Sequence, residues 1–201
     1  VYMQVQVAEM VRCGGHYTSV VVLMWVPADM LAVRGMSFIN AANLAPLPYS
    51  DASLGVLVGG VASDFLLKRN GSANLARKLA IVTGMILAST IVSANYVAPS
   101  DNAAVIAILS VAFFGQGMTN LGWTVIADVA PKKLFGLTAG IFNFSANLAG
   151  IATPIVVGVF YGMTGSFVAP LAYIAVVALI GAFSYLVILG DIHRLDIAEA
   201  R

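Results

Sequence analysis

Charged side chains are scarce in this sequence, because Asp, Glu, Lys and Arg together make up only 9% of its 201 residues. Soluble domains carry about 25% charged residues, and so few charges cannot cover a water-facing surface. Hydrophobic residues make up 60% of the chain and the mean hydropathy is +0.94. The net charge of +1 gives no reason to propose nucleic acid as a partner. These shortages exclude an ordinary soluble domain and favour a chain whose solvent is a lipid bilayer.

Cysteine and histidine are equally rare. Cys13 is the single cysteine and cannot form an internal disulfide, and His16 and His193 are the two histidines. The sequence offers neither a cluster of metal-ligating residues nor a nucleophile with a partner base, so an enzyme is the weakest functional class and we expect no metal and no cofactor. The first eleven residues lack a basic region followed by an apolar core, so we expect no cleavable signal peptide.

The sequence contains several long runs without a charged residue. A bilayer core about 30 Å thick needs roughly 20 apolar residues per helix. Suitable runs extend from Leu79 to Ala98 and from Asn102 to Ala127. The stretch from Leu134 to Gly190 contains no charged residue and is about twice as long as one crossing needs. We therefore expect two helices there, joined by a turn between Gly162 and Ser166.

Two less regular runs complete the set. One extends from Tyr17 to Val33 and contains Asp29, and the other extends from Ala41 to Leu67 and contains Asp51. The sequence thus predicts an all-α membrane protein with six transmembrane helices. We expect a membrane domain over residues 17–190, between an N-terminal segment of residues 1–16 and a tail of residues 191–201.

The bases are distributed unevenly between the two sides of such a bundle. With six spans, the even-numbered loops and both termini lie on one side, and nine of the ten bases fall there: Arg12, Lys68, Arg69, Arg77, Lys78, Lys132, Lys133, Arg194 and Arg201. Only Arg34 falls on the other side. The positive-inside rule makes the base-rich side cytoplasmic. We therefore expect both termini in the cytoplasm and a multi-pass protein of the cell inner membrane.

A short motif lies in the predicted second loop, residues 64–78. Gly60 and Asp64 are followed by Lys68 and Arg69, in the stretch GGVASDFLLKR. An acid among bases at a helix end does nothing for orientation, so it suggests a specific ion pair or helix-end contact. The motif resembles the cytoplasmic loop signature of the major facilitator superfamily, which joins the second and third helices of each six-helix half. The resemblance implies that these four residues form a gating loop.

A second resemblance is more extensive and starts at Phe113, with FFGQGMTNLGWTVIADVAPKKLFGLTAGIFNFSANLAGIATPIVVGVFYGMTGSF. It is similar to the C-terminal half of the anion:cation symporter branch of that superfamily, and in particular to bacterial carriers of galactonate, glucarate and galactarate. This resemblance implies secondary active transport of a sugar acid such as D-galactonate, by proton symport, together with an N-terminal half. It covers roughly residues 52–195 and weakens upstream.

Polar residues recur at helical spacing on two predicted spans. Gln116, Asn120 and Trp123 are spaced i, i+4 and i+7, and Asn143 and Asn147 are spaced i and i+4. Amides need partners in hydrocarbon, so both groups are expected to face the bundle interior. The family resemblance implies that Trp123 and Asn143 contact the substrate, with the other three as further binding candidates. The alternative is that the amides only hold helices together.

Several interpretations remain open. Six helices are half of a twelve-helix carrier, and the family resemblance implies that the arginine for the substrate carboxylate and the proton-carrying acids belong to the other half. The chain is then a working half, a truncated or decayed fragment without transport activity, or half of a homodimer. The glycine pairs 55/59, 136/140 and 158/162 would allow close helix contacts in such a dimer. Asp29 and Asp51 are either proton-coupling groups or signs that residues 1–55 have diverged.

Overall fold

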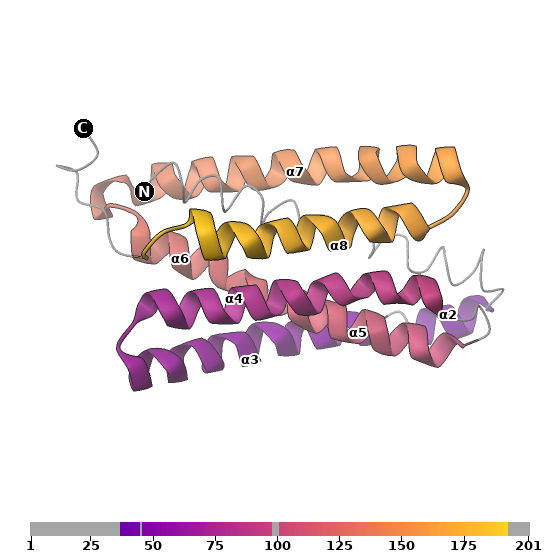
Figure 1. Ribbon diagram of the computed structural model, residues 1–201, viewed down its shortest axis with the longest axis horizontal. Helices are drawn as coiled ribbons and strands as arrows, with labels where there is room; N and C mark the ends of the chain where they lie inside the picture. Colours follow the sequence, from indigo (N-terminus) through magenta and orange to yellow (C-terminus); the bar gives the residue numbers. More distant parts are fainter. Residues whose placement is uncertain (1–36, 45, 98–100, 193–201) are drawn as a thin grey trace.

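The computed structural model describes residues 37–44, 46–97 and 101–192, and these ranges form helices and turns without a strand. Figure 1 shows the order of the helices along the chain. They are α2 (Phe38–Leu44), α3 (Pro46–Asn70), α4 (Ala73–Ser89), α5 (Asn102–Met118), α6 (Gly122–Val129), α7 (Phe135–Thr164) and α8 (Val168–Phe183). Three 3-10 segments, Thr90–Tyr96, Thr119–Leu121 and Lys132–Leu134, and one π-helical turn, Ser184–Ile188, extend or connect them.

Five helical segments of the described chain are long and apolar enough to cross a bilayer. They are Ala42–Asn70, Ala73–Tyr96, Asn102–Val129, Lys132–Thr164 and Val168–Ile188. Each corresponds to one of the spans expected from the sequence, which confirms a helical, multi-pass membrane protein. The remaining expected span, Tyr17 to Val33, lies outside the described residues.

The connection between α3 and α4 is much shorter than predicted. The expected loop over residues 64–78 is wrong in its extent, because helix continues on both sides and only Gly71 and Ser72 are non-helical. Gly71 ends α3 at a φ of 67°, a conformation that glycine adopts without strain. The Ser72 side chain then caps α4 by accepting a hydrogen bond of 3.3 Å from the Leu75 backbone N–H. Most of the charges therefore lie on helix ends.

The turn between α7 and α8 confirms the prediction of two helices in the longest uncharged stretch. Helix α7 ends at Thr164, and Gly165 follows in the left-handed conformation with a φ of 61°. The Gly165 N–H donates to the Tyr161 carbonyl over 2.7 Å, which is the usual way for a glycine to close a helix. Ser166 then accepts a hydrogen bond of 3.2 Å from the Val168 N–H. Helix α8 begins at Val168 and runs back along α7.

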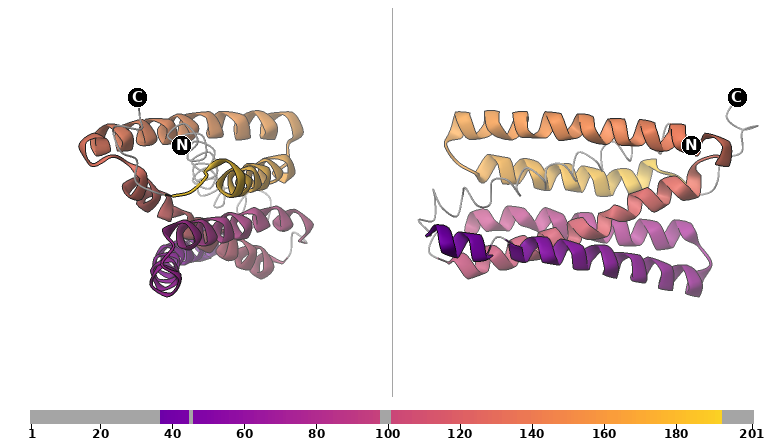
Figure 2. Two further views of the ribbon diagram at one scale, coloured as in Figure 1. Left: turned by 60° about the vertical axis from the view of Figure 1, so that its left-hand side comes forward. Right: turned by 180° about the vertical axis from the view of Figure 1, so that it is seen from behind.

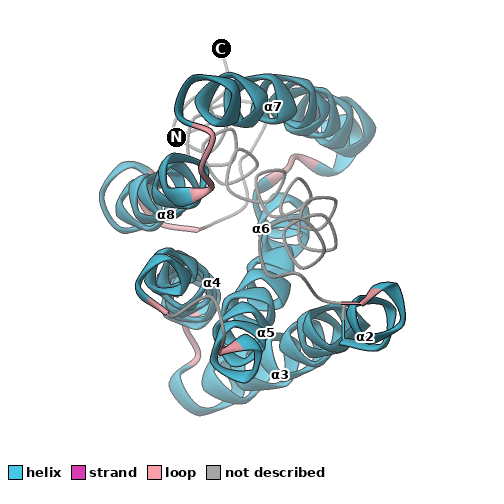
Figure 3. Cartoon of the chain, turned by 90° about the vertical axis from the view of Figure 1, so that its right-hand side faces the viewer, coloured by secondary structure: helices cyan, strands magenta, loops and turns pink. Residues whose placement is uncertain are grey.

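The described helices form a bundle in which α7 is the outermost helix on one side. Figures 2 and 3 show α3, α4 and α5 together, with α8 and α6 between them and α7. Helix α4 also packs against α8, and buried side chains of α4, α6 and α8 share one apolar cluster with the residues that follow α8. Its members are Ala80, Ile81, Val82, Met85, Leu121, Val125, Val129, Ala182, Tyr185, Leu189 and Ile192.

Glycines set the distance between α5 and its two neighbours. A Cβ added at Gly55 would meet the Phe114 backbone, and one added at Gly117 would meet the Ala52 backbone, so α3 and α5 touch through main chain. Between α4 and α5, a Cβ at Gly84 would lie 2.5 Å from the Gly115 carbonyl oxygen. By contrast, Cβ atoms at Gly136, Gly140, Gly158 and Gly162 would meet nothing within 4 Å. Of the three predicted glycine pairs, 55/59 makes a close helix contact within the described chain, and the other two make none there, so a contact with a second chain stays a prediction for them.

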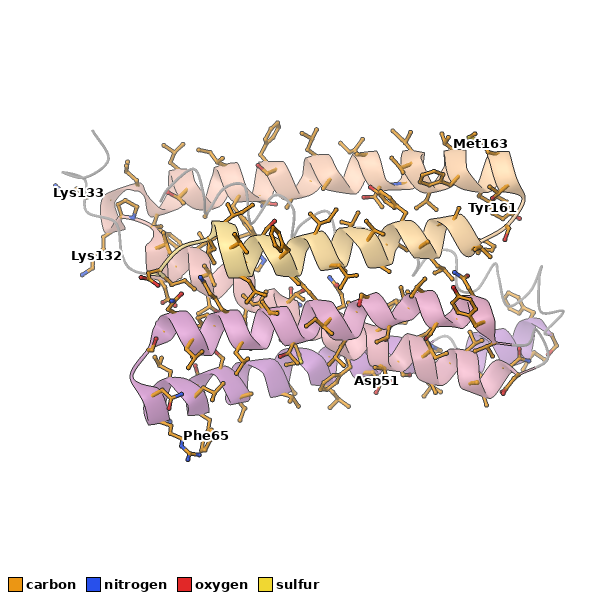
Figure 4. The ribbon with its side chains drawn as sticks, in the orientation of Figure 1. Asp51, Phe65, Lys132, Lys133, Tyr161 and Met163 are labelled. Atoms are coloured by element: carbon orange, nitrogen blue, oxygen red, sulfur yellow. The ribbon has the colours of Figure 1, made fainter. Side chains whose placement is uncertain are left out.

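The bases of the described chain gather at one end of the bundle. Lys68 and Arg69 lie in the last turn of α3 and Arg77 and Lys78 lie in the first turns of α4, at the same end. Figure 4 shows Lys132 and Lys133 at the same end of the bundle as Phe65, and Tyr161 and Met163 at the other end. This arrangement agrees with the charge distribution from which the orientation was predicted.

Candidate functional site

An aromatic contact joins α6 to α7 at the first part of the site. The indole of Trp123 meets the ring of Phe142 edge-on, with 4.4 Å between ring centroids and 81° between ring planes. Phe142 is buried, whereas Trp123 keeps 47% of its surface exposed. Such edge-to-face pairs are worth about 0.5–1.5 kcal/mol beyond their buried area. The contact holds the indole of α6 against Phe142, which is the residue directly before Asn143 on α7.

The two predicted asparagines of α7 form a hydrogen-bonded pair. Asn147 donates from Nδ2 to the backbone carbonyl of Asn143 over 2.8 Å and to Asn143 Oδ1 over 2.6 Å. Both side chains are exposed. The i, i+4 spacing brings them together, as the sequence predicted.

Helix α7 presents three different faces, and the asparagines occupy one of them. Its buried residues form one face: Thr138, Phe142, Ala146, Thr153 and Val157. An exposed apolar stripe follows a four-then-three spacing: Leu137, Ile141, Phe144, Leu148, Ile151 and Ile155. At 3.6 residues per turn, Asn143 and Asn147 lie roughly 100° around the helix from this stripe. The amide pair is therefore separate from the surface that suits lipid tails.

The structure does not align the three polar residues of the other predicted face. The span bends from α5 through a 3-10 turn, Thr119–Leu121, into α6, and this tighter turn changes the angular phase between Gln116 and Trp123. Gln116 is 8% exposed, Asn120 is half-buried and Trp123 is exposed. Sequence spacing alone assumed one continuous α-helix. Asn120 and Trp123 are accessible from the bundle surface, and Gln116 is enclosed by its neighbours.

A charged cluster ties three helices together at the base-rich end. Arg77 of α4 is 8% exposed. Its Nη1 donates to Ser63 Oγ over 2.9 Å and to Asp64 Oδ1 over 3.1 Å, both on α3, and its Nε donates to Asp128 Oδ2 on α6 over 3.3 Å. A guanidinium suits this role because its donors are rigidly arranged and it always carries charge. We call Ser63, Asp64, Arg77 and Asp128 the Arg77 cluster.

Sequence reasoning found part of this cluster and missed the rest. Asp64 was expected to make a specific ion pair and does so with Arg77. The buried position of Arg77 and the role of Asp128 were not foreseen. One signal was available, since Asp128 is the single charged residue in the long stretch from Asn102 to Pro131 and sits at its base-rich end. The other members of the predicted gating loop, Lys68 and Arg69, are exposed, and Gly60 faces open space.

A second polar link lies close to the Arg77 cluster. Asn74 of α4 donates from Nδ2 to Asp191 Oδ1 over 2.6 Å, and its Oδ1 accepts from the Ile192 backbone N–H over 3.3 Å. The link ties the first turn of α4 to the residues that follow α8.

The remaining acids give no metal site in the part of the chain that is described. No three His, Cys, Asp or Glu side chains come together there as a metal would need. Asp51 lies in the second turn of α3 and is partly exposed, and Figure 4 shows it near the middle of the bundle's length. Asp29 lies outside the described residues, so the expectation for it stays open.

Comparison with known proteins gives a consistent set of relatives, although no family model matches the chain. The probable galactarate/D-glucarate transporter GudP of Escherichia coli K12 is 44% identical over 175 residues, which are 87% of this chain and 38% of that protein. A protein of the same description from Bacillus subtilis 168 is 40% identical over 173 residues, or 86% of this chain and 37% of that protein.

The D-galactonate transporter of Escherichia coli O6:H1 is 36% identical over 172 residues, which are 86% of this chain and 39% of that protein. The chain thus spans less than two fifths of the length of these curated relatives. All three are transporters by name, and none is an enzyme.

Proposed function

This chain corresponds to the C-terminal half of a transporter of the major facilitator type, and on that premise we propose that it takes part in secondary active transport of a sugar acid. The substrate is a hexonate or aldarate, for example D-galactonate, and a proton moves with it. The single observation that carries the proposal is its 36–44% identity to sugar-acid transporters over about 87% of its length.

The proposal includes a topology. Six transmembrane helices would span residues 17–190, with residues 1–16 and 191–201 as cytoplasmic ends of a protein of the cell inner membrane. The five apolar helices and the common end of the described bases support this arrangement. Lys132 and Lys133 would then lie at the cytoplasmic surface.

The substrate site in this half is formed by Trp123 and Asn143, with Asn120, Gln116 and Asn147 close by. The accessible indole offers an apolar surface for the carbon chain of a sugar acid, and the amides offer hydrogen bonds to its oxygens. The contact between Trp123 and Phe142 supports this grouping, because it brings α6 against α7 beside Asn143.

The negatively charged carboxylate of the substrate requires a cation in its binding site. The described bases lie at one end of the bundle, and Lys133, the base nearest in sequence, stands ten residues before Asn143, so the described part of this surface has no cation beside the amide pair for a carboxylate. An N-terminal half would supply that cation, and both halves would enclose the substrate near the middle of the bilayer. The same observation favours a second candidate, a truncated or decayed fragment without transport activity.

Uptake of radiolabelled D-glucarate and D-galactonate tests the proposal. Cells lacking their own carriers would express this chain alone, a matching N-terminal half alone, or both. We expect uptake only with both halves, because neither half surrounds the substrate by itself. With both halves in the membrane, the absence of uptake of either sugar acid would refute the proposal and favour the inactive fragment.

Asp64 is proposed to act in gating at the cytoplasmic side. During alternating access the segment around Asp64, Lys68 and Arg69 would bond to the other half and release as the two halves rock. We expect Asp64→Asn to slow uptake by the paired halves several-fold with normal membrane insertion, since Ser63 and Asp128 still hold Arg77. Arg69→Ala tests the exposed base in the last turn of α3, which follows the turn of Asp64. Unchanged uptake by Asp64→Asn would remove Asp64 from the gate.

A further inference from the structure

We propose that Asn147 is a positioning residue, which turns the side-chain amide of Asn143 so that its Nδ2 group donates to an oxygen of the substrate. The inference rests on the proposed function, because it assumes that Asn143 meets a sugar acid. It assigns a different task to each member of the asparagine pair, whereas helical spacing alone placed both among the binding residues.

The backbone decides how the two amides are oriented. Asn147 Nδ2 lies 2.8 Å from the Asn143 backbone oxygen, which can only accept, so the group facing it must be the NH2 of Asn147. The same NH2 lies 2.6 Å from the Asn143 side chain, which must therefore present its oxygen, Oδ1. The Asn143 amide cannot rotate by half a turn without placing two NH2 groups against each other.

The consequence is a fixed pair of donors on Asn143. Both N–H groups of Asn147 Nδ2 are used on Asn143, one on the backbone oxygen and one on Oδ1. Asn143 Oδ1 is engaged by Asn147, so Asn143 offers its own Nδ2 to a ligand. A pair of N–H donors selects an acceptor oxygen, and a carboxylate oxygen is the strongest acceptor that a sugar acid carries.

The position of the pair on α7 suits this task. The asparagines lie between the buried face of the helix and its exposed apolar stripe, on the exposed part of the surface. Asn143 directly follows Phe142, whose ring holds Trp123. The inference takes the indole and the donors of Asn143 to face one substrate, since Asn143 is the next residue of α7 after the one that Trp123 contacts. In a low-dielectric site, an amide whose orientation is fixed before binding loses less entropy than a freely rotating one.

A double-mutant cycle separates positioning from direct binding. It compares Asn143→Ala, Asn147→Ala and the double variant in the paired halves, through the KM and the maximal rate of D-glucarate uptake. We expect KM to rise about tenfold for Asn143→Ala and about threefold for Asn147→Ala, which corresponds to losing one hydrogen bond and to loosening it. The double variant should match Asn143→Ala, because Asn147 then has no amide to orient. Maximal rates should stay within about twofold.

The control is Ser145→Ala. Ser145 is also a polar residue of α7 and is partly exposed, but its hydroxyl donates to the Ile141 carbonyl over 3.0 Å and it lies on the opposite side of the helix from Asn143 and Asn147. Its KM should equal that of the unaltered carrier. Immunoblots of the membrane fraction show whether each variant inserts.

Other outcomes overturn the inference in distinguishable ways. If the effects of the two single changes on KM multiply in the double variant, Asn147 binds the substrate by itself. If Asn147→Ala lowers membrane abundance and maximal rate with KM unchanged, the pair serves only the stability of α7. If the unaltered paired halves take up no sugar acid, the proposed function fails and this inference falls with it.

Discussion

Arg77→Ala is expected to be among the most damaging substitutions in the described chain, lowering the free energy of unfolding by about 2–4 kcal/mol. Arg77 is buried and holds Ser63, Asp64 and Asp128 through three hydrogen bonds, so its removal frees α3 and α6 from α4 and leaves the acids without their cation. For a chain of this size, the loss corresponds to a fall in melting temperature of roughly 4–16 °C. The melting temperature is measured by heating the purified chain in detergent and using size-exclusion chromatography to determine how much of it remains folded at each temperature.

Two further variants make this prediction specific. Arg77→Lys should recover only part of the loss, because an ammonium on a flexible stem cannot reproduce donors that point at α3 and α6 simultaneously. Arg69→Ala removes an exposed base from the last turn of α3 and should shift the melting temperature by less than about 2 °C. Equal melting temperatures for Arg77→Ala and Arg69→Ala would contradict the structural role of the Arg77 cluster.

Gly117→Leu is expected to have an effect of similar or greater size. Any Cβ at Gly117 would meet the Ala52 backbone, and a main chain cannot move aside as a flexible side chain can. Helices α3 and α5 would have to separate, and overpacking of this kind costs about 1–3 kcal/mol or more. We expect most of the purified variant to elute as aggregate in size-exclusion chromatography, where the unaltered chain elutes as one species. Gly117→Ala should show a smaller loss in the same direction.

Gly136 supplies the matched control for Gly117. It lies in the first turn of α7 and a Cβ there would meet nothing within 4 Å. Gly136→Ala should therefore be neutral or stabilising by up to about 1 kcal/mol, because alanine favours helix over glycine. If Gly117→Leu and Gly136→Ala gave the same elution profile, the close approach of α3 and α5 would be disproved.

The comparison of these glycines shows where sequence reasoning reaches its limit. A glycine pair at i and i+4 allows two helix backbones to approach closely, but its presence in the sequence does not show that a partner helix is there. The pairs 136/140 and 158/162 have the same spacing as 55/59, yet no described residue of this chain lies within 4 Å of a Cβ added there. By contrast, the turn at Gly165 was predictable, because a stretch that is twice one crossing must reverse and glycine is the residue that reverses it most easily.

The positions of the charged residues also depend on packing that the sequence pattern does not show. Bases in a row were interpreted as a cytoplasmic loop, yet α3 continues to Asn70 and α4 already begins at Ala73. Helix ends at a membrane surface tolerate charge as readily as loops do, so composition alone could not place the turn. The burial of Arg77 depends on Asp128, which lies 51 residues away in sequence, and only the packing of α4 against α6 brings the two together.

The candidate site was predictable where it depends on one helix. Asn143 and Asn147 lie on the same α7 surface and bond to each other, as the i, i+4 rule implies. The exposure of Gln116 was not predictable, since it depends on the 3-10 turn at Thr119–Leu121 and on the packing of α5 between α3 and α4. The contact of Trp123 with Phe142 depends on how α6 meets α7, which periodicity does not determine.

The link from Asn74 to Asp191 and Ile192 has a consequence for the order of assembly during synthesis. Asn74 leaves the ribosome more than a hundred residues before Asp191, so its partner does not exist while the intervening helices insert. The first turn of α4 acquires this contact only when translation has passed the end of α8. The link therefore joins α4 to the residues after α8 only once all the helices between them have been synthesised.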